Sequence, residues 1–320
     1  MTAPALAVPW FESPFFEREV ESAGLAPAAA ERVCRFARDG YVLFRPDIPE
    51  FDRLADEIVQ SLEPEHAVAG PRIMDAWRYQ PAVRRLAAHP AILQALEELY
   101  RRPAFPFQTL NFREGSQQRT HSDVVHFNSM PPRFMAGVWF ALEDVGPDNG
   151  PLHYYAGSHR LPVYELHDIG LAGHKLSDRT ARYAGYEEFV ARMVDIHGLE
   201  KEVVTAKRGE ALIWAANLFH GGEPIRRAGS TRYTQVTHYY FRGCRYYNPL
   251  YSEPPLGRYA WKRVIDVRTD QPVPHEYDGQ RVGLPIRQRA RYMVEDALNR
   301  NESGRKLYRA VKRRLSGTAG

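Results

Sequence analysis

The stretch Gln117-Gln-Arg-Thr-His121-Ser-Asp123-Val-Val-His126-Phe127 contains an imidazole and a carboxylate two residues apart. In an extended strand, residues i and i+2 point to the same face. A strand over residues 120–127 would therefore let His121 and Asp123 reach one metal ion without a special loop. By itself the His-x-Asp pattern is weak evidence, because a strand on the protein surface can carry it equally well.

A second stretch, Gly209-Glu-Ala-Leu-Ile-Trp-Ala-Ala-Asn-Leu-Phe-His220-Gly-Gly, supplies another imidazole at the end of an apolar, strand-like run. Two histidines and one carboxylate form the facial triad of non-haem Fe(II) oxygenases, which leaves coordination positions open. Twelve residues after His220 comes Arg232, and a guanidinium binds a carboxylate through two parallel hydrogen bonds. We interpret His121, Asp123 and His220 as metal ligands and catalytic residues, and Arg232 as the partner of a dicarboxylate co-substrate.

Together these motifs resemble the phytanoyl-CoA dioxygenase (PhyH) family of Fe(II)/2-oxoglutarate-dependent oxygenases. The resemblance covers about residues 35–245, in the family's order, through the elements His121-Ser-Asp123, Asn149-Gly-Pro-Leu152, Gly157-Ser-His159, Gly209-Glu-Ala-Leu-Ile-Trp214, His220-Gly-Gly222 and Arg232. The family's spacing between the last histidine and the arginine is slightly shorter. Arg226 or Arg227 is therefore an alternative to Arg232.

The resemblance implies a double-stranded β-helix (jelly roll, cupin-like) core, mainly β with flanking helices. It also implies a dioxygenase that uses Fe(II), 2-oxoglutarate and O2 to hydroxylate a small molecule, with release of succinate and CO2. Related halogenases carry a small residue in place of the carboxylate, so Asp123 favours hydroxylation over halogenation. Gln108, Asn111 and Trp214 are candidates for the cofactor pocket, although core packing beside the metal strand is the simpler interpretation for Trp214.

The candidate substrate-binding residues follow the His-x-Asp motif and are His126, Phe127 and Asn128. On a continuous strand, the odd offset from Asp123 would point His126 to the opposite face, whereas a turn would bring it toward the substrate. His153 and His238 are the rival metal ligands. We expect His238 to be a core or surface histidine, because no acidic residue lies near it in the sequence.

The composition is that of a globular protein. A chain of 320 residues that is 44% hydrophobic can bury a sizeable core, and its net charge of +4 is no nucleic-acid footprint. The two cysteines, Cys34 and Cys244, form neither a disulfide framework nor a zinc site at ligand spacing. Without a signal-peptide pattern or an apolar run of about 18 residues, we expect a cytoplasmic protein without a transmembrane segment.

We expect one catalytic domain over residues 1–320. Residues 1–106 form an N-terminal arm and buttressing helices, with a strand at 41–44 and helices at 28–38, 51–62 and 83–100. Residues 107–245 form the jelly-roll core, with short strands at 107–112, 120–127, 135–142, 203–205, 211–214 and 233–241. The inserted segment 160–200, with a helix at 186–196, is either a lid over the site or a helix packed outside.

Residues 246–320 form an aromatic loop followed by a basic helical tail. The rings of the loop either line a substrate pocket or pack the loop against the domain, and packing is the simpler interpretation. The tail over 287–314 has the composition of a solvated terminal helix, with a helix that binds a membrane surface or an anionic partner as the alternative.

Two other function classes remain open. A non-catalytic jelly-roll protein that binds a metabolite or glycan would not need three ligands and an arginine. A zinc enzyme can use the same ligands, but it would not need Arg232. The aromatic stretch 239–261 and scattered arginines favour a mid-sized, partly polar or anionic substrate, and the sequence does not identify it.

Overall fold

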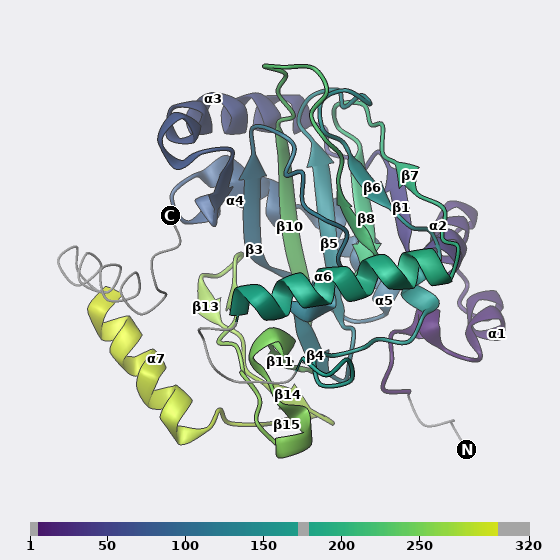
Figure 1. Cartoon of the computed structure of the whole chain (residues 1–320), viewed down its shortest axis with the longest axis vertical. Helices are drawn as coiled ribbons and strands as arrows, with labels where there is room; N and C mark the ends of the chain where they lie inside the picture. The colour runs from purple at the N-terminus through teal and green to yellow at the C-terminus, as the bar shows by residue number, and fades with distance from the viewer. Residues whose placement is uncertain (1–5, 172–178, 300–320) are drawn as a thin grey trace.

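A six-stranded antiparallel sheet forms the centre of the computed structural model, which describes residues 6–171 and 179–299 (Figure 1). Its strands in spatial order are β1 (Tyr41–Phe44), β8 (Ala211–Ala215), β5 (Met135–Ala141), β10 (Thr234–Phe241), β3 (Ala104–Phe112) and β2 (Arg72–Met74). The central strands β5 and β10 are buried at every position, because both faces of the sheet are covered.

A smaller sheet faces the large one and consists of β7 (Glu202–Val203), β6 (Leu152–Tyr154) and β9 (His220–Gly222). An isolated bridge between His121 and His220 extends it at the β9 edge. Apolar side chains fill the space between the sheets, among them Trp139, Tyr154 and Leu218. Two facing antiparallel sheets with flanking helices form a jelly roll, so the predicted fold class is confirmed.

Four helices cover the other face of the large sheet: α2 (Pro27–Asp39), α3 (Phe51–Ala69), α4 (Pro81–Ala87) and α5 (Pro90–Tyr100). The main core lies between these helices and the sheet, and it includes Leu54, Leu96 and Phe140. Helix α6 (Arg179–Ile196) crosses in front of the opposite face of the sheet (Figure 1). Within the described residues, no helix is both long and apolar enough to cross a membrane.

The remaining elements are short pieces and two peripheral helices. They are η1 (Trp10–Glu12), α1 (Phe16–Glu21), η2 (Ala76–Arg78), η3 (Asp123–Val125), β4 (Asn128–Met130), η4 (Ser158–Arg160), β11 (Arg245–Tyr247), η6 (Pro249–Tyr251), η7 (Pro254–Leu256), β12 (Ile265–Asp266), β13 (Gln271–Pro272), β14 (Glu276–Tyr277), β15 (Gln280–Arg281) and α7 (Ile286–Asn299). Strand β4 pairs with β11, which attaches the C-terminal segment to the stretch that follows the metal motif.

Two sequence-based expectations about local structure are wrong. Residues 120–127 do not form a strand, because the chain leaves the bridge at His121 and enters the 3-10 turn η3, where the Ser122 hydroxyl accepts the Val124 amide. The helix expected over 83–100 is two helices. The first ends at Ala87, and the second begins with Pro90 at its first position, where proline is favoured.

Most other predicted elements are confirmed, although two helices are longer than expected and the strand expected at 203–205 is the two-residue strand β7. The helix expected at 51–62 continues to Ala69, and the helix expected at 186–196 begins at Arg179. Strands β2, β6 and β9 were not predicted, since each has only three residues. The basic tail is helical through Asn299, and its part beyond residue 299 lies outside the described residues.

Candidate metal centre

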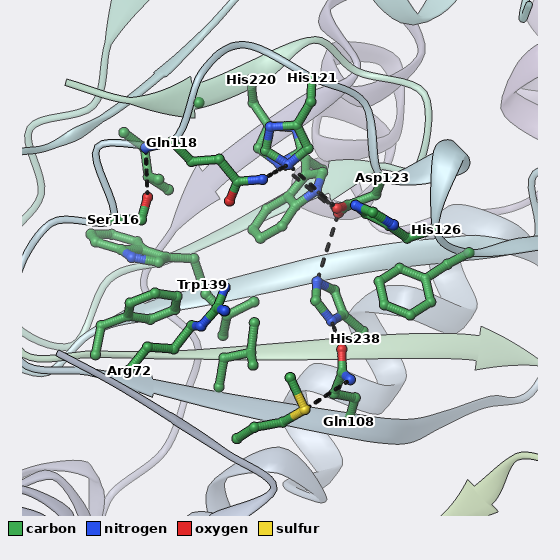
Figure 2. Close-up of a pocket in the computed structure, with 18 of the residues that line it drawn as sticks. Arg72, Gln108, Ser116, Gln118, His121, Asp123, His126, Trp139, His220 and His238 are labelled. Carbon is green, nitrogen blue, oxygen red and sulfur yellow. Dashed lines mark hydrogen bonds and ion pairs between the residues drawn. The ribbon is translucent and has the colours of Figure 1, made fainter. Parts of the chain in front are cut away.

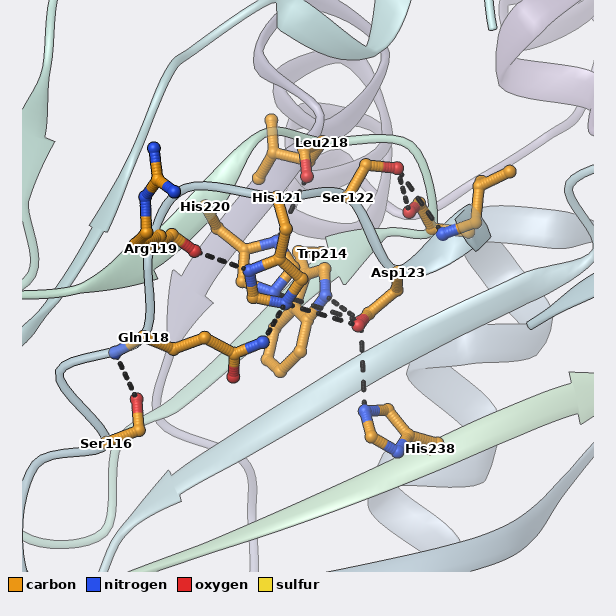
Figure 3. A network of polar contacts seen from close by, with 12 residues as sticks. Ser116, Gln118, Arg119, His121, Ser122, Asp123, Trp214, Leu218, His220 and His238 are labelled. Carbon is orange, nitrogen blue, oxygen red and sulfur yellow. Dashed lines mark hydrogen bonds and ion pairs between the residues drawn. The ribbon is translucent and has the colours of Figure 1, made fainter. Parts of the chain in front are cut away.

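Three side chains from two distant stretches converge at one edge of the small sheet (Figure 3). The backbone amides of His121 and His220 donate to each other's carbonyls at 2.9 Å, which holds the two imidazole centroids 4.5 Å apart. Asp123 is the first residue of η3, and this turn directs its carboxylate to the two rings. All three residues are buried or nearly so, and one ligand atom from each lies within 4.8 Å of the others. This geometry fits a divalent metal such as Fe(II).

The two imidazoles are oriented by backbone carbonyls. The Nδ1 of His121 donates to the Arg119 carbonyl at 2.9 Å, and the Nδ1 of His220 donates to the Leu218 carbonyl at 3.0 Å. Each Nε2 therefore presents its lone pair to the space between the three side chains. The arrangement selects the tautomer that a metal needs.

Burial sets the charge states of the ligand set. Burial is the largest cause that lowers the pKa of His121 to about 4, and it also lowers the pKa of His220. Burial raises the pKa of Asp123, but His220, His238 and His121 outweigh it and bring this pKa to about 2. At neutral pH the site therefore holds two neutral imidazoles and one carboxylate, which are the forms that bind a metal.

A tryptophan positions the carboxylate. The Nε1 of Trp214, on β8, donates to the Asp123 Oδ2 at 2.9 Å. The indole lies flat against Gly137 of β5, where a Cβ would come within 2.1 Å of the Trp214 ring. Trp214 therefore lines the cavity and also packs in the core between the sheets, while its contact with a cofactor stays a prediction.

His238, expected to be a core or surface histidine, is buried and lies beside the three proposed metal ligands. Its Nε2 is 3.7 Å from the Asp123 Oδ2, and its Nδ1 is 3.0 Å from the Gln108 Oε1 (Figure 2). Both His238 and Gln108 line the cavity. On the other side of the triad, the Gln118 amide lies 3.3 Å from the His121 Nε2 and donates to the Tyr183 hydroxyl of α6 at 3.0 Å.

The three proposed ligands lie at a cavity of about 910 Å³, which is lined by residues of both sheets and by Tyr183 of α6; part of the lining is drawn in Figure 2. Arg232 lines this cavity and is only 1% exposed. Its Nη1 donates to the Gly150 carbonyl at 2.9 Å, whereas its Nε has no hydrogen-bond partner in the described part of the chain. Burial lowers the pKa of Arg232 to about 10, so the guanidinium stays charged at neutral pH. A buried cation with an unused donor fits a carboxylate ligand.

The alternatives to Arg232 lie outside the cavity. Arg226 and Arg227 are exposed on the turn before it, where their backbone amides donate to the Asp148 carbonyl. The rival ligand His153 points behind the site, to the Thr120 hydroxyl and to Glu223.

Two residues that were predicted to line the pocket lie outside the cavity in the structure. Asn111 lies on the helix-facing side of β3, where its amide donates to the Gln235 Oε1, because it is three residues from Gln108 and so faces the other way. Asn128 is buried in β4 and bonds to the Tyr247 hydroxyl and to local amides. His126 and Phe127 do line the cavity, as expected for a turn at this point.

Several cavity residues were missed by the sequence interpretation: Arg72, Gln118, Tyr183 and Lys262. Gln118 lies three residues before His121, so its position was detectable in the motif itself. The others come from a short edge strand, from α6 and from the C-terminal segment, and nothing in their local sequence marks them. The aromatic rings of that segment, such as Tyr246 and Trp261, are buried packing groups, as favoured from the sequence.

Solved structures with the same fold include iron and 2-oxoglutarate proteins. EctD from S. alaskensis, solved with 2-oxoglutarate and 5-hydroxyectoine, matches with a TM-score of 0.56 and 20% identity over 76% of this chain and 84% of its own. The epimerase SnoN from nogalamycin biosynthesis, solved with Fe3+, alpha ketoglutarate and nogalamycin RO, matches with a TM-score of 0.54 and 21% identity over 68% and 86%. The carbocyclase SnoK from the same biosynthesis gives 0.54 and 20% over 70% and 88%.

The sequence itself decides the family. A search of curated proteins found no match. The family model for phytanoyl-CoA dioxygenase (PhyH) matches residues 28–233, which include all three proposed metal ligands and Arg232. This range covers more than half of the chain, and the fold and the buried ligand set agree with it. The chain therefore belongs to the phytanoyl-CoA dioxygenase family, whose members carry a dioxygenase-type function.

Proposed function

We propose that this protein is an Fe(II)- and 2-oxoglutarate-dependent dioxygenase that hydroxylates a small-molecule substrate. One C–H bond of the substrate, one O2 and one 2-oxoglutarate would become a C–OH group, succinate and CO2. The observation that carries the proposal is Arg232, whose buried and partly unpaired guanidinium lines the same cavity as the ligand set. A binding protein or a zinc hydrolase would have no use for this cation beside His121, Asp123 and His220.

Each part of the site has a defined task in this proposal. His121, Asp123 and His220 would hold Fe(II), which together with 2-oxoglutarate supplies the oxidising chemistry when bound. Arg232 would bind the carboxylate of 2-oxoglutarate that lies away from the metal and so fix its orientation. Trp214 holds one oxygen of Asp123 in place through its 2.9 Å hydrogen bond.

The apolar walls of the cavity protect the reaction. Trp139, Val236 and Leu152 line the space next to the ligands. Such walls keep bulk water away from the reacting groups and strengthen the electrostatic contacts of Arg232. They also leave room for a substrate beside the co-substrate.

The test is succinate formation by anaerobically purified protein supplied with Fe(II), 2-oxoglutarate and air, with and without a panel of candidate substrates. We expect succinate that depends on iron and oxygen, and a hydroxylated product from the panel member that accelerates it. Asp123→Ala should abolish succinate while circular dichroism shows an unchanged fold. Wild-type turnover in Asp123→Ala would refute the ligand assignment.

The same experiment separates the other function classes. Binding of a panel member without succinate, in protein shown to hold iron, would favour the metabolite-binding alternative. Conversion of a panel member by zinc-loaded protein without oxygen would favour the zinc enzyme. If the substrate is oxidised to a product other than an alcohol, the assignment as a dioxygenase would stand, and only the proposed hydroxylation would be wrong.

A further inference from the structure

Lys262 reaches the cavity from a segment that follows the family-matched region 28–233. Its backbone is fixed on both sides, because its amide donates to the Tyr246 carbonyl at 2.8 Å and its carbonyl accepts the His275 Nε2 at 2.8 Å. Asn248 and Leu250 of the same segment line the cavity next to it. The C-terminal segment therefore forms one wall of the cavity and holds a cation there in a fixed position.

The ammonium group of Lys262 has no hydrogen bond or ion pair with any described residue. Its Nζ lies 4.3 Å from the ring centroid of Phe127 and 6.0 Å from that of Phe107. Burial lowers the pKa of Lys262 to about 8, with Asp75 acting in the opposite direction, so the group is mostly protonated at neutral pH. A cation held over aromatic faces with three donors unused is suited to bind an anion.

Lys262 and Arg232 serve different ends of the cavity. Arg232 lies 5.8 Å from the Phe112 ring, while Lys262 lies near Phe107 of the same strand. Five residues of strand span roughly 15 Å. The four carbon–carbon bonds of 2-oxoglutarate, at about 1.5 Å each, span at most about 6 Å. A 2-oxoglutarate whose two carboxylates are bound to the metal and to Arg232 has no further carboxylate for Lys262.

The charges of the loaded cavity lead to the same conclusion. Fe(II) and the two carboxylates of 2-oxoglutarate cancel each other, and Asp123 offsets Arg232. Lys262 and the exposed Arg72 then remain as positive charges of the lining, because Asp75, the carboxylate that acts on Lys262, does not line the cavity. A positively charged cavity attracts negatively charged ligands.

Lys262 is also close enough to influence what reaches the metal. The Phe127 ring under its ammonium lies 4.9 Å from the His238 ring, and the His238 Nε2 lies 3.7 Å from the Asp123 Oδ2. A molecule paired with Lys262 and lying along Phe127 would extend directly toward the ligand set. Resting on the proposed function, we propose that the substrate carries an anionic group that pairs with Lys262, next to an apolar part that lies against Phe127.

The test uses Mn(II) in place of Fe(II), with saturating 2-oxoglutarate, and measures binding by calorimetry. The probes are benzoate, phenylacetate, 3-phenylpropanoate and 4-phenylbutanoate, each beside its primary amide, which has the same shape without the charge. The variants are Lys262→Met, which retains the apolar stem, and Lys262→Arg, which retains the charge. Lys207→Met is the matched control, because Lys207 is paired with Asp144 on the surface.

We expect at least one acid to bind the wild type about tenfold or more tightly than its amide, the range of a charge-assisted hydrogen bond. Lys262→Met should remove this preference, whereas Lys262→Arg and Lys207→Met should retain it. Equal binding of acids and amides by the wild type, absence of binding by any acid, or an acid preference that persists in Lys262→Met would each overturn the proposal.

The two proposals fail separately in this experiment. Titration of Mn(II) and 2-oxoglutarate into the wild type tests the dioxygenase site before any probe is added. An acid preference that depends on Lys262 in a protein that does not bind 2-oxoglutarate would retain the anion site and refute the proposed function. Normal 2-oxoglutarate binding without an acid preference would refute only the anion site.

Discussion

Replacing Arg232 by Met should separate stability from co-substrate binding. The guanidinium is buried, and burial lowers its pKa from the ordinary value of an arginine to about 10. A lowered pKa in a basic group means that folding disfavours the charged form. At about 1.4 kcal/mol per pKa unit, the charge costs the ligand-free protein about 3 kcal/mol at neutral pH. The hydrogen bond to the Gly150 carbonyl returns about 1 kcal/mol of this, so removal of the charge should not destabilise the fold.

Co-substrate binding should respond in the opposite direction. Truncation of one partner of a buried charge pair costs about 2–5 kcal/mol, so Arg232→Met should bind 2-oxoglutarate between about thirtyfold and a few thousandfold more weakly. Arg227→Met is the matched control, because Arg227 is an exposed arginine close by in the sequence. It should bind 2-oxoglutarate as the wild type does.

Two measurements on the Mn(II)-loaded protein check this reasoning. Calorimetry gives the affinity for 2-oxoglutarate, and thermal unfolding without co-substrate gives the stability. We expect a melting temperature for Arg232→Met equal to the wild type or up to about 4 °C higher, at about 2 °C per kcal/mol. An affinity within threefold of the wild type would refute the role of Arg232. A melting temperature more than about 4 °C below the wild type would show that the arginine serves the fold instead.

Three further predictions concern the metal ligands and their supports. Asp123→Asn, which keeps the shape and the Trp214 contact but loses the charge, should weaken Mn(II) binding at least about tenfold by calorimetry, and unchanged affinity would contradict the ligand role. Gly137→Ala should lower both the melting temperature and succinate formation, because the new Cβ overlaps the Trp214 ring, and a variant with wild-type stability and turnover would refute this packing. Because burial lowers the pKa of His121 to about 4 and lowers that of His220, Mn(II) affinity should change less than about tenfold between pH 7.5 and 5.5, whereas two histidines with ordinary pKa values would lose about a hundredfold. A hundredfold loss, with circular dichroism unchanged, would contradict the stated cause.

The grouping of His121, Asp123 and His220 was predictable from the sequence, but the local structure that brings them together was not. His121 and Asp123 were expected to share a face because of the two-residue period of a strand. In the structure they converge because the chain turns at Ser122, whose hydroxyl accepts the Val124 amide. The two-residue spacing predicts that the two side chains can reach one point. It does not distinguish a strand from a three-residue turn, because both can bring residues i and i+2 together.

Strand parity explains why one of two candidate pocket residues on β3 lines the cavity and the other does not. Gln108 and Asn111 were both assigned to the pocket, although an odd separation of three residues places them on opposite faces of the same strand. Gln108 contacts His238 in the cavity, and Asn111 contacts Gln235 under the helices. Their polar side chains alone led to the assignment of both residues to the pocket. The two-residue period of a strand would have excluded one of them.

The substrate-facing wall was beyond the sequence for a physical reason. Metal ligands need particular atoms at fixed distances, so they leave a recognisable pattern in short motifs. Lys262 lies more than forty residues from His220 and reaches the cavity only because β11 pairs with β4 and places the C-terminal segment over Phe127. A residue placed by such pairing has no local signal, because the pairing is made by backbone groups and does not depend on a motif around residue 262. The chemistry common to the family is therefore readable in the motifs, while the features that select a substrate depend on which distant segments the fold brings to the cavity.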